Sequence, residues 1–152
     1  MSVGARQANA PQRSVIVANR QPRVVDEQAL ATLAAETLAA EGVERAELSL
    51  SFVDEREMAE LHERYMHEPG PTDVLSFPLG DDDVDEDGVR MLGDVVIAPA
   101  VAARNNPADP EAEMRLLVVH GVLHVLGYDH EADDESAEMW ARQERYSGVT
   151  LP

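Results

Sequence analysis

Residues 109–130 read DPEAEMRLLVVHGVLHVLGYDH, and this stretch guides the interpretation of the rest of the chain. It predicts a long helix from Asp109 to about Leu126. Gly127 is expected to end that helix, because glycine readily adopts the left-handed backbone conformation at which a helix stops and the chain turns back. We therefore expect a central helix with histidines clustered at its C-terminal end.

Strands and helices alternate on the N-terminal side of this helix. Short β-branched or alternating apolar runs predict four strands, at residues 14–18, 46–53, 74–77 and 91–97. Apolar residues at helical spacing, with capping aspartates and stop signals, predict further helices from Asp26 to Gly42, from Asp54 to Pro69, over 99–105 and from Asp133 to about Tyr146. The pattern predicts an α+β fold with a small mixed four-stranded sheet packed with about five helices.

The domain organisation is simple. The 152 residues have the length of one domain, and we expect a single domain over residues 14–152. Residues 1–13 are polar and small, without periodicity, and are expected to form a disordered lead-in.

Composition narrows the possible functions. The chain has no cysteine, which excludes disulfides, thiolate zinc sites and a cysteine nucleophile. Its formal net charge of -18 argues against binding nucleic acid through an overall positive field, so an RNA partner would have to meet local arginines or a bound metal. No segment approaches the ~20 consecutive apolar residues of a membrane helix, and the first residues lack an apolar signal. We expect a cytoplasmic protein with no membrane partner.

Three of the five histidines lie in the quoted stretch. His120 and His124 are four residues apart, so on a helix both imidazoles project from the same face, one turn apart. His130 follows the turn at Gly127 and can return to the same point as a third ligand. Three neutral imidazoles with an open fourth position are typical of a catalytic zinc, and we predict one Zn²⁺ per chain. The alternative is a set of unrelated histidines on an amphipathic helix.

The residues beside these histidines limit the chemistry. A zinc ion held this way lowers the pKa of its bound water to about 7, which favours hydrolysis at neutral pH. Zinc proteases of this spacing place a glutamate directly after the first histidine as general base, whereas this chain has Gly121. A peptidase mechanism is therefore unsupported. Asp129 either orients an imidazole or caps the turn.

Residues 120–130, HGVLHVLGYDH, closely resemble the signature H-G-x-x-H-x-x-G-Y-D-H of the YbeY family of bacterial endoribonucleases. Two upstream segments are similar to further motifs of that family, in the same order: GPTDVLSFP at 70–78 and LGDVVI at 92–97. The resemblance covers roughly residues 14–146. It implies a zinc-dependent, single-strand-specific endoribonuclease that matures ribosomal RNA, notably the 3′ end of the small-subunit RNA, and assists ribosome quality control. It also implies ribosomal proteins or assembly factors as partners, with no DNA expected, and the three histidines as zinc ligands.

One position departs from the family. Many members carry an arginine directly after the tyrosine that ends the helix before the P-T-D-V-L-S-F segment, and it is thought to help catalysis. Here Met66 follows Tyr65. An arginine stabilises charge on phosphoryl oxygens, so its role is left empty or passes to Arg64, Arg115 or the metal. Arg115, on the same helix as His120, is the better candidate.

Other candidate site residues lie on the predicted strands. Ser76 and Phe77 are expected to line the cleft as part of an edge strand and to bind substrate, with a core role for Phe77 as the alternative. Asp94, a lone carboxylate within a strand, is expected to form a hydrogen bond near the site. With Arg115 and Asp129 as catalytic residues, these complete the predicted site.

Two other functions remain open. The first is a non-enzymatic ribosome assembly factor, in which the metal fixes the fold and acidic surfaces bind basic ribosomal proteins. The second is a metallopeptidase or other zinc hydrolase, which Gly121 disfavours.

Overall fold

One four-stranded sheet forms the centre of the molecule in the computed structural model, which describes residues 11–80, 83–128 and 133–149. Its spatial order is β1-β2-β4-β3; the first three are mutually parallel, and β3 is antiparallel to β4. The predicted mixed sheet is confirmed, with strands β1 (Gln12–Arg20), β2 (Arg45–Val53), β3 (Val74–Pro78) and β4 (Arg90–Ile97).

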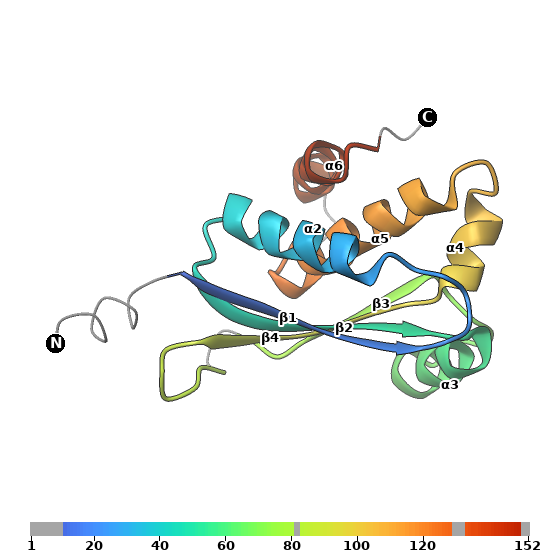
Figure 1. Cartoon of the computed structure of the whole chain (residues 1–152), viewed down its shortest axis with the longest axis horizontal. Coiled ribbons are helices and arrows are strands. Elements are labelled where there is room, and N and C mark those ends of the chain that lie inside the picture. Colours follow the sequence, from blue (N-terminus) through green and yellow to red (C-terminus); the bar gives the residue numbers. More distant parts are fainter. Residues whose placement is uncertain (1–10, 81–82, 129–132, 150–152) are drawn as a thin grey trace, which may run out of the picture.

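Five helices occur in the described residues, as predicted: α2 (Glu27–Ala40), α3 (Glu55–Met66), α4 (Pro99–Asn105), α5 (Pro110–Val125) and α6 (Asp133–Ser147). Aspartates begin three of them, because the side chains of Asp26, Asp54 and Asp109 accept a backbone N–H of the first turn. Figure 1 shows α2 and α5 on one face of the sheet, α6 outside them, and α3 on the opposite face.

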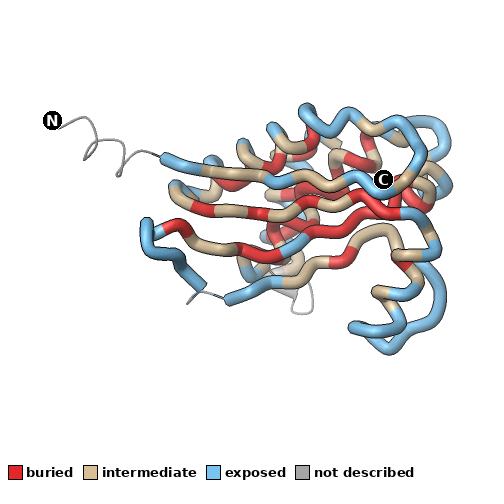
Figure 2. Tube along the Cα trace, turned by 60° about the horizontal axis from the view of Figure 1, so that its bottom comes forward, coloured by how far each residue is buried: buried red, intermediate tan, exposed pale blue. Residues whose placement is uncertain are grey.

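The alternation of side chains along β4 separates two cores. Val95 and Ile97 face α2 and α5 and join the larger cluster, which includes Val118 and Val122 of α5. Val96 faces the other way and packs with a smaller cluster that includes Met58 of α3. Buried residues run along the middle of the sheet in Figure 2. The two faces of the sheet are therefore distinct environments.

Helix α5 is the central helix that the sequence predicts. It lies between the sheet, α2 and α6, and ten of its sixteen residues are buried. A helix that is apolar on nearly every side is expected to be surrounded by protein. Only a few side chains of α5 are therefore even partly exposed, and those of His120 and His124 are among them.

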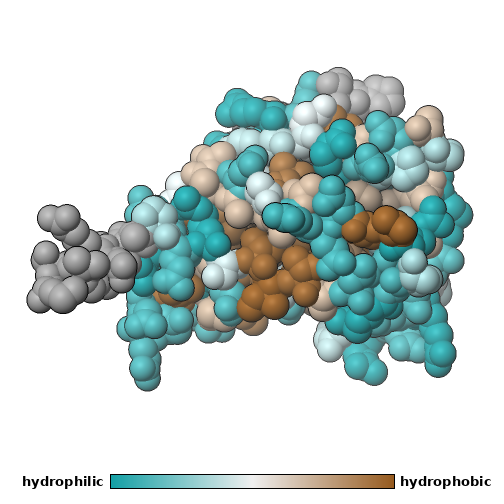
Figure 3. Space-filling model, viewed as in Figure 1, coloured by the Kyte–Doolittle hydropathy of each residue, from teal (hydrophilic) through white to brown (hydrophobic). Residues whose placement is uncertain are grey.

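The start of the first strand and the surface complete the description. Strand β1 begins at Gln12, earlier than predicted, because its N–H donates to the carbonyl of Glu44 at 2.6 Å; residues 1–10 of the predicted lead-in lie outside the described residues. The surface in Figure 3 is mainly hydrophilic, with apolar side chains gathered where α2 meets β1. Within the described ranges, no helix has the length and apolar character needed to cross a bilayer.

Candidate metal centre

Two histidines form the heart of the site. His120 and His124 lie one turn apart on α5, with ring centroids 4.5 Å apart and ring planes inclined by 65°. Both residues are partly buried. The spacing of four residues brings the imidazoles together, as the sequence predicts, and provides two nitrogen ligands that suit zinc.

Gln143 of α6 orients the first histidine. Its side-chain amide oxygen lies 2.7 Å from Nδ1 of His120, and Gln143 is only 2% exposed. An amide oxygen only accepts hydrogen bonds, so Nδ1 carries the proton and the lone pair of a neutral ring is at Nε2. A hydrogen bond of this kind is what orients metal-binding histidines in proteins. The pair thus fits a zinc ion bound through Nε2 of His120.

The sequence did not point to Gln143, apart from its spacing of four residues from the apolar Met139. Met139 and Gln143 are four residues apart and both buried, so they share the inward face of α6. An uncharged polar side chain at a buried position of such an acidic helix indicates a specific partner. Which partner it meets depends on how α6 packs on α5, and no local pattern provides that.

Gly121 allows α5 to approach the sheet. A Cβ added at Gly121 would lie 2.4 Å from Cγ1 of Val95, a contact that real structures do not contain. Ser76 of β3 reaches the same point, and its hydroxyl donates to the carbonyl of Gly121 at 3.3 Å. The position that a peptidase would fill with a general-base glutamate therefore has no room for a side chain.

The turn after α5 has the predicted form. Gly127 adopts a φ of +104°, within the left-handed region. Its N–H donates to the carbonyl of His124 at 3.0 Å, and the N–H of Tyr128 donates to that of Leu123 at 3.0 Å. These two bonds define a Schellman motif, which ends the helix and redirects the chain toward residues 129–132.

The buried carboxylate of Glu41 binds Tyr128, the residue after Gly127. The side chain of Glu41, at the end of α2, is 6% exposed and accepts hydrogen bonds from the hydroxyls of Tyr128, at 2.5 Å, and Tyr146. Arg142 donates to the same carboxylate at 2.6 Å. Burial alone would raise the pKa of Glu41, but these three donors outweigh it and lower that pKa. Burial and the Glu41 carboxylate also raise the pKa of Tyr128 to about 12, so the phenol stays protonated and keeps donating.

The third predicted ligand follows, in the sequence, a residue of the Glu41 cluster, which consists of Glu41, Tyr128, Arg142 and Tyr146. His130 is two residues beyond Tyr128. His130 and Asp129 themselves lie outside the described residues. Among the residues that are described, no group of three His, Asp or Glu side chains suits a metal ion.

The structure does not bring Arg115 to the histidine pair. It is five residues before His120, which places it about 140° further round the helix. Its Nε donates instead to the carbonyl of Ser147 at 3.4 Å. The position that many family members fill with arginine, Met66, is 53% exposed at the end of α3, on the opposite face of the sheet.

The three candidate strand residues divide between the two faces. Ser76 lies opposite Val95 in the β3–β4 register and faces α5, as its bond to Gly121 shows. Phe77 and Asp94 pair with each other and lie on the α3 face. Phe77 packs against the smaller core and against the ring of Tyr65, at 5.1 Å between centroids, so its core role is the one observed. Asp94 is exposed. The structure thus joins Ser76 to the helix of the histidines, but not Phe77 or Asp94.

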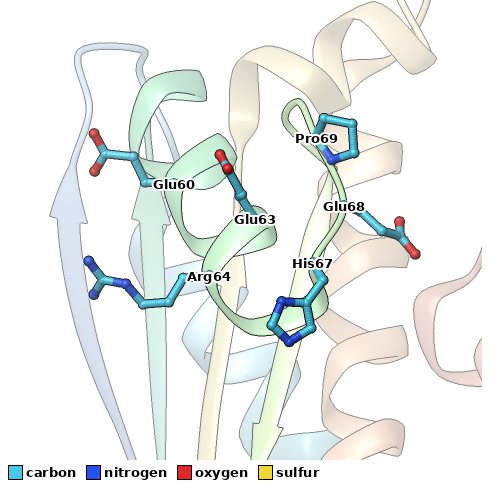
Figure 4. Close-up of a pocket in the computed structure, with 6 residues that line it drawn as sticks. All are labelled: Glu60, Glu63, Arg64, His67, Glu68 and Pro69. Carbon is cyan, nitrogen blue, oxygen red and sulfur yellow. The ribbon is translucent and has the colours of Figure 1, made fainter.

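A surface hollow of about 610 Å³ lies elsewhere, over the C-terminal half of α3. Figure 4 shows its side chains splayed around the helix end rather than converging on one point. The hollow is lined by three carboxylates and one arginine, and this excess of negative charge does not suit an RNA phosphate. The lining residues are Glu60, Glu63, Arg64, His67, Glu68 and Pro69. The histidine pair, not this hollow, is therefore the candidate site.

This chain is similar to known proteins over most of its length. Residues 15–148 match the family model described as endoribonuclease YbeY. A protein of that name from Acidothermus cellulolyticus is 48% identical over 142 residues, covering 86% of this chain and 87% of the relative. One from Streptomyces coelicolor is 43% identical over 141 residues, covering 86% of each. A solution structure of a Thermotoga maritima protein matches with a TM-score of 0.60 and 29% identity, over 88% of this chain and 86% of that one. The chain therefore belongs to the endoribonuclease YbeY family.

Proposed function

We propose that this endoribonuclease hydrolyses phosphodiester bonds in single-stranded ribosomal RNA, notably at the 3′ end of the small-subunit RNA, using one zinc ion held by His120, His124 and His130. The observation that carries the proposal is the histidine pair, with Gln143 accepting from Nδ1 of His120 so that the lone pair of the neutral ring is on Nε2. A zinc ion in such a site supplies Lewis acidity and a water molecule whose pKa is near 7.

The residues of this chain then have separate tasks. His120 and His124 hold the ion, and Gln143 keeps His120 in the tautomer that can bind it. Gly121 and Ser76 set the distance between α5 and the sheet, so the pair keeps a fixed position relative to β3. The Glu41 cluster restrains Tyr128, which is two residues before His130 in the sequence. With Gly121 against Val95, a peptidase general base has no place here, which favours the nuclease over the peptidase.

Metal-loaded wild type and His124→Ala test the proposal on a small-subunit ribosomal RNA fragment, offered single-stranded and as a duplex. We expect the wild type to cut only the single strand, and His124→Ala to cut neither. His67→Ala, which removes a histidine exposed at the end of α3, serves as the matched control and should cut like the wild type. Equal cutting by His124→Ala would overturn the proposal.

The net charge of -18 favours a second candidate, a cytoplasmic ribosome assembly factor that binds basic ribosomal proteins and keeps its metal for stability. This role is compatible with the first. Cells that carry only His124→Ala separate them: normal small-subunit RNA ends in those cells would favour the assembly role, and unprocessed ends would favour the nuclease.

A further inference from the structure

A tryptophan lies beside the histidine pair, and the metal site does not use it. Trp140 of α6 is the only tryptophan of the chain and is 41% exposed. Its ring centroid is 6.4 Å from that of His120, and the two planes are inclined by 39°. The indole forms one wall of a hollow of about 210 Å³ with Gln143, Glu144 and Val149. An exposed aromatic side chain in contact with a metal ligand is placed to meet the substrate of that metal.

The indole is held in one orientation. Its Nε1–H donates to the hydroxyl of Ser136, one turn earlier on α6, at 2.9 Å. This bond satisfies the only polar group of the side chain and restrains its rotation. A ligand that stacks on the ring therefore loses little free energy in ordering it.

The charges around Trp140 favour a base over a phosphate. Glu138 and Glu144 are exposed on the same helix, and although Glu138 pairs with Arg142 at 3.0 Å, neither carboxylate attracts a phosphate group. With a net charge of -18, the chain as a whole does not attract one either. Nucleobases carry no charge, and proteins that bind single-stranded RNA commonly stack them on aromatic side chains, largely independently of sequence.

We propose that Trp140 is a stacking platform for one unpaired base of the RNA substrate, beside the histidine pair. The inference rests on the proposed function and deepens it, because a base that must leave its duplex to stack here makes the enzyme select single strands. Trp140 would hold the base beside the phosphodiester that a metal on the histidines would bind.

Fluorescence anisotropy of a labelled pentauridylate, with the metal-loaded protein, tests this directly; a gel confirms that the RNA is intact after each titration. Trp140→Ala should weaken binding roughly 5- to 150-fold, the loss expected when one base no longer stacks. Trp140→Phe should retain most of the affinity. Ile16→Ala removes a side chain of similar exposure from the edge strand β1 and should bind like the wild type.

An abasic pentamer with the same phosphates separates stacking from a structural role. The wild type should prefer pentauridylate to the abasic chain, and Trp140→Ala should bind both equally. Quenching of the single tryptophan's emission should accompany binding of pentauridylate only. If wild type and Trp140→Ala bind pentauridylate equally while the wild type still cuts ribosomal RNA, the stacking inference is wrong and the proposed function stands. If the wild type neither binds nor cuts RNA, both are wrong.

Discussion

Replacing Gly121 by alanine tests why the motif has a glycine between its first two histidines. The new Cβ would lie 2.4 Å from Cγ1 of Val95, whereas carbon atoms in optimal contact are about 3.5–4.0 Å apart. A separation of about 1 Å must therefore open between α5 and β4. Val95 cannot yield easily, because it is fully buried and its Cγ2 and Cβ would be only 3.1 and 3.3 Å away.

The expected change in the free energy of unfolding follows from two opposing effects. Overpacking a core costs about 1–3 kcal/mol, and alanine gains about 1 kcal/mol over glycine within a helix. Gly121→Ala should therefore be less stable than wild type by up to about 2 kcal/mol. Urea unfolding followed by far-ultraviolet circular dichroism measures the difference.

Val95→Ala, made alone and together with Gly121→Ala, provides the control. Alone it creates a cavity and costs roughly 1–3 kcal/mol, but in the double variant it removes the two nearest clashing atoms. We expect the double variant to lose less unfolding free energy than the two single variants lose in sum, by about 1 kcal/mol or more. Additive costs in the double variant would refute the packing argument.

Two further predictions concern the residues that support the site. Gln143→Leu leaves Nδ1 of His120 without its acceptor, so zinc affinity should fall about 10- to 100-fold in competition with a chromophoric chelator, and unchanged affinity would contradict the orienting role. Glu41→Gln should cost roughly 1–3 kcal/mol at pH 7, because the donors to Glu41 lose a charged acceptor. The folded-state pKa of Glu41 lies below its unfolded value of 4.5, so the charged carboxylate contributes stability above that pH and loses it as the pH falls through the folded pKa. The difference between the two proteins in urea unfolding should therefore shrink below about pH 4.5; a constant difference from pH 7 to 3 would argue against the ionised cluster.

Much of the fold was predictable, because its signals are local. The capping aspartates Asp26, Asp54 and Asp109 mark three helix starts, and each makes the bond that its position predicts. Gly127 takes the left-handed conformation expected of a helix end. The spacing of His120 and His124 brings their rings together without help from the rest of the chain.

What the sequence could not provide depends on packing between distant segments. Glu41 meets Tyr128 and Tyr146 across 87 and 105 residues, and no local pattern pairs them. The alternation of β3 separates Ser76 from Phe77, but only the packing of α5 shows which of them faces the histidines. Arg115 is different, because its spacing from His120 already places it on another side of the helix.

The central claim is that one zinc ion held by the histidines carries RNA cleavage, and a zinc titration tests it most directly. Metal-free wild type and His124→Ala would receive increasing zinc, with bound metal and the initial rate of ribosomal RNA cutting measured on the same samples. We predict that the wild-type rate rises in proportion to bound zinc and levels off at one ion per chain, while His124→Ala binds zinc weakly and stays inactive. Full cutting by the metal-free wild type, or by His124→Ala at any zinc level, would contradict the account.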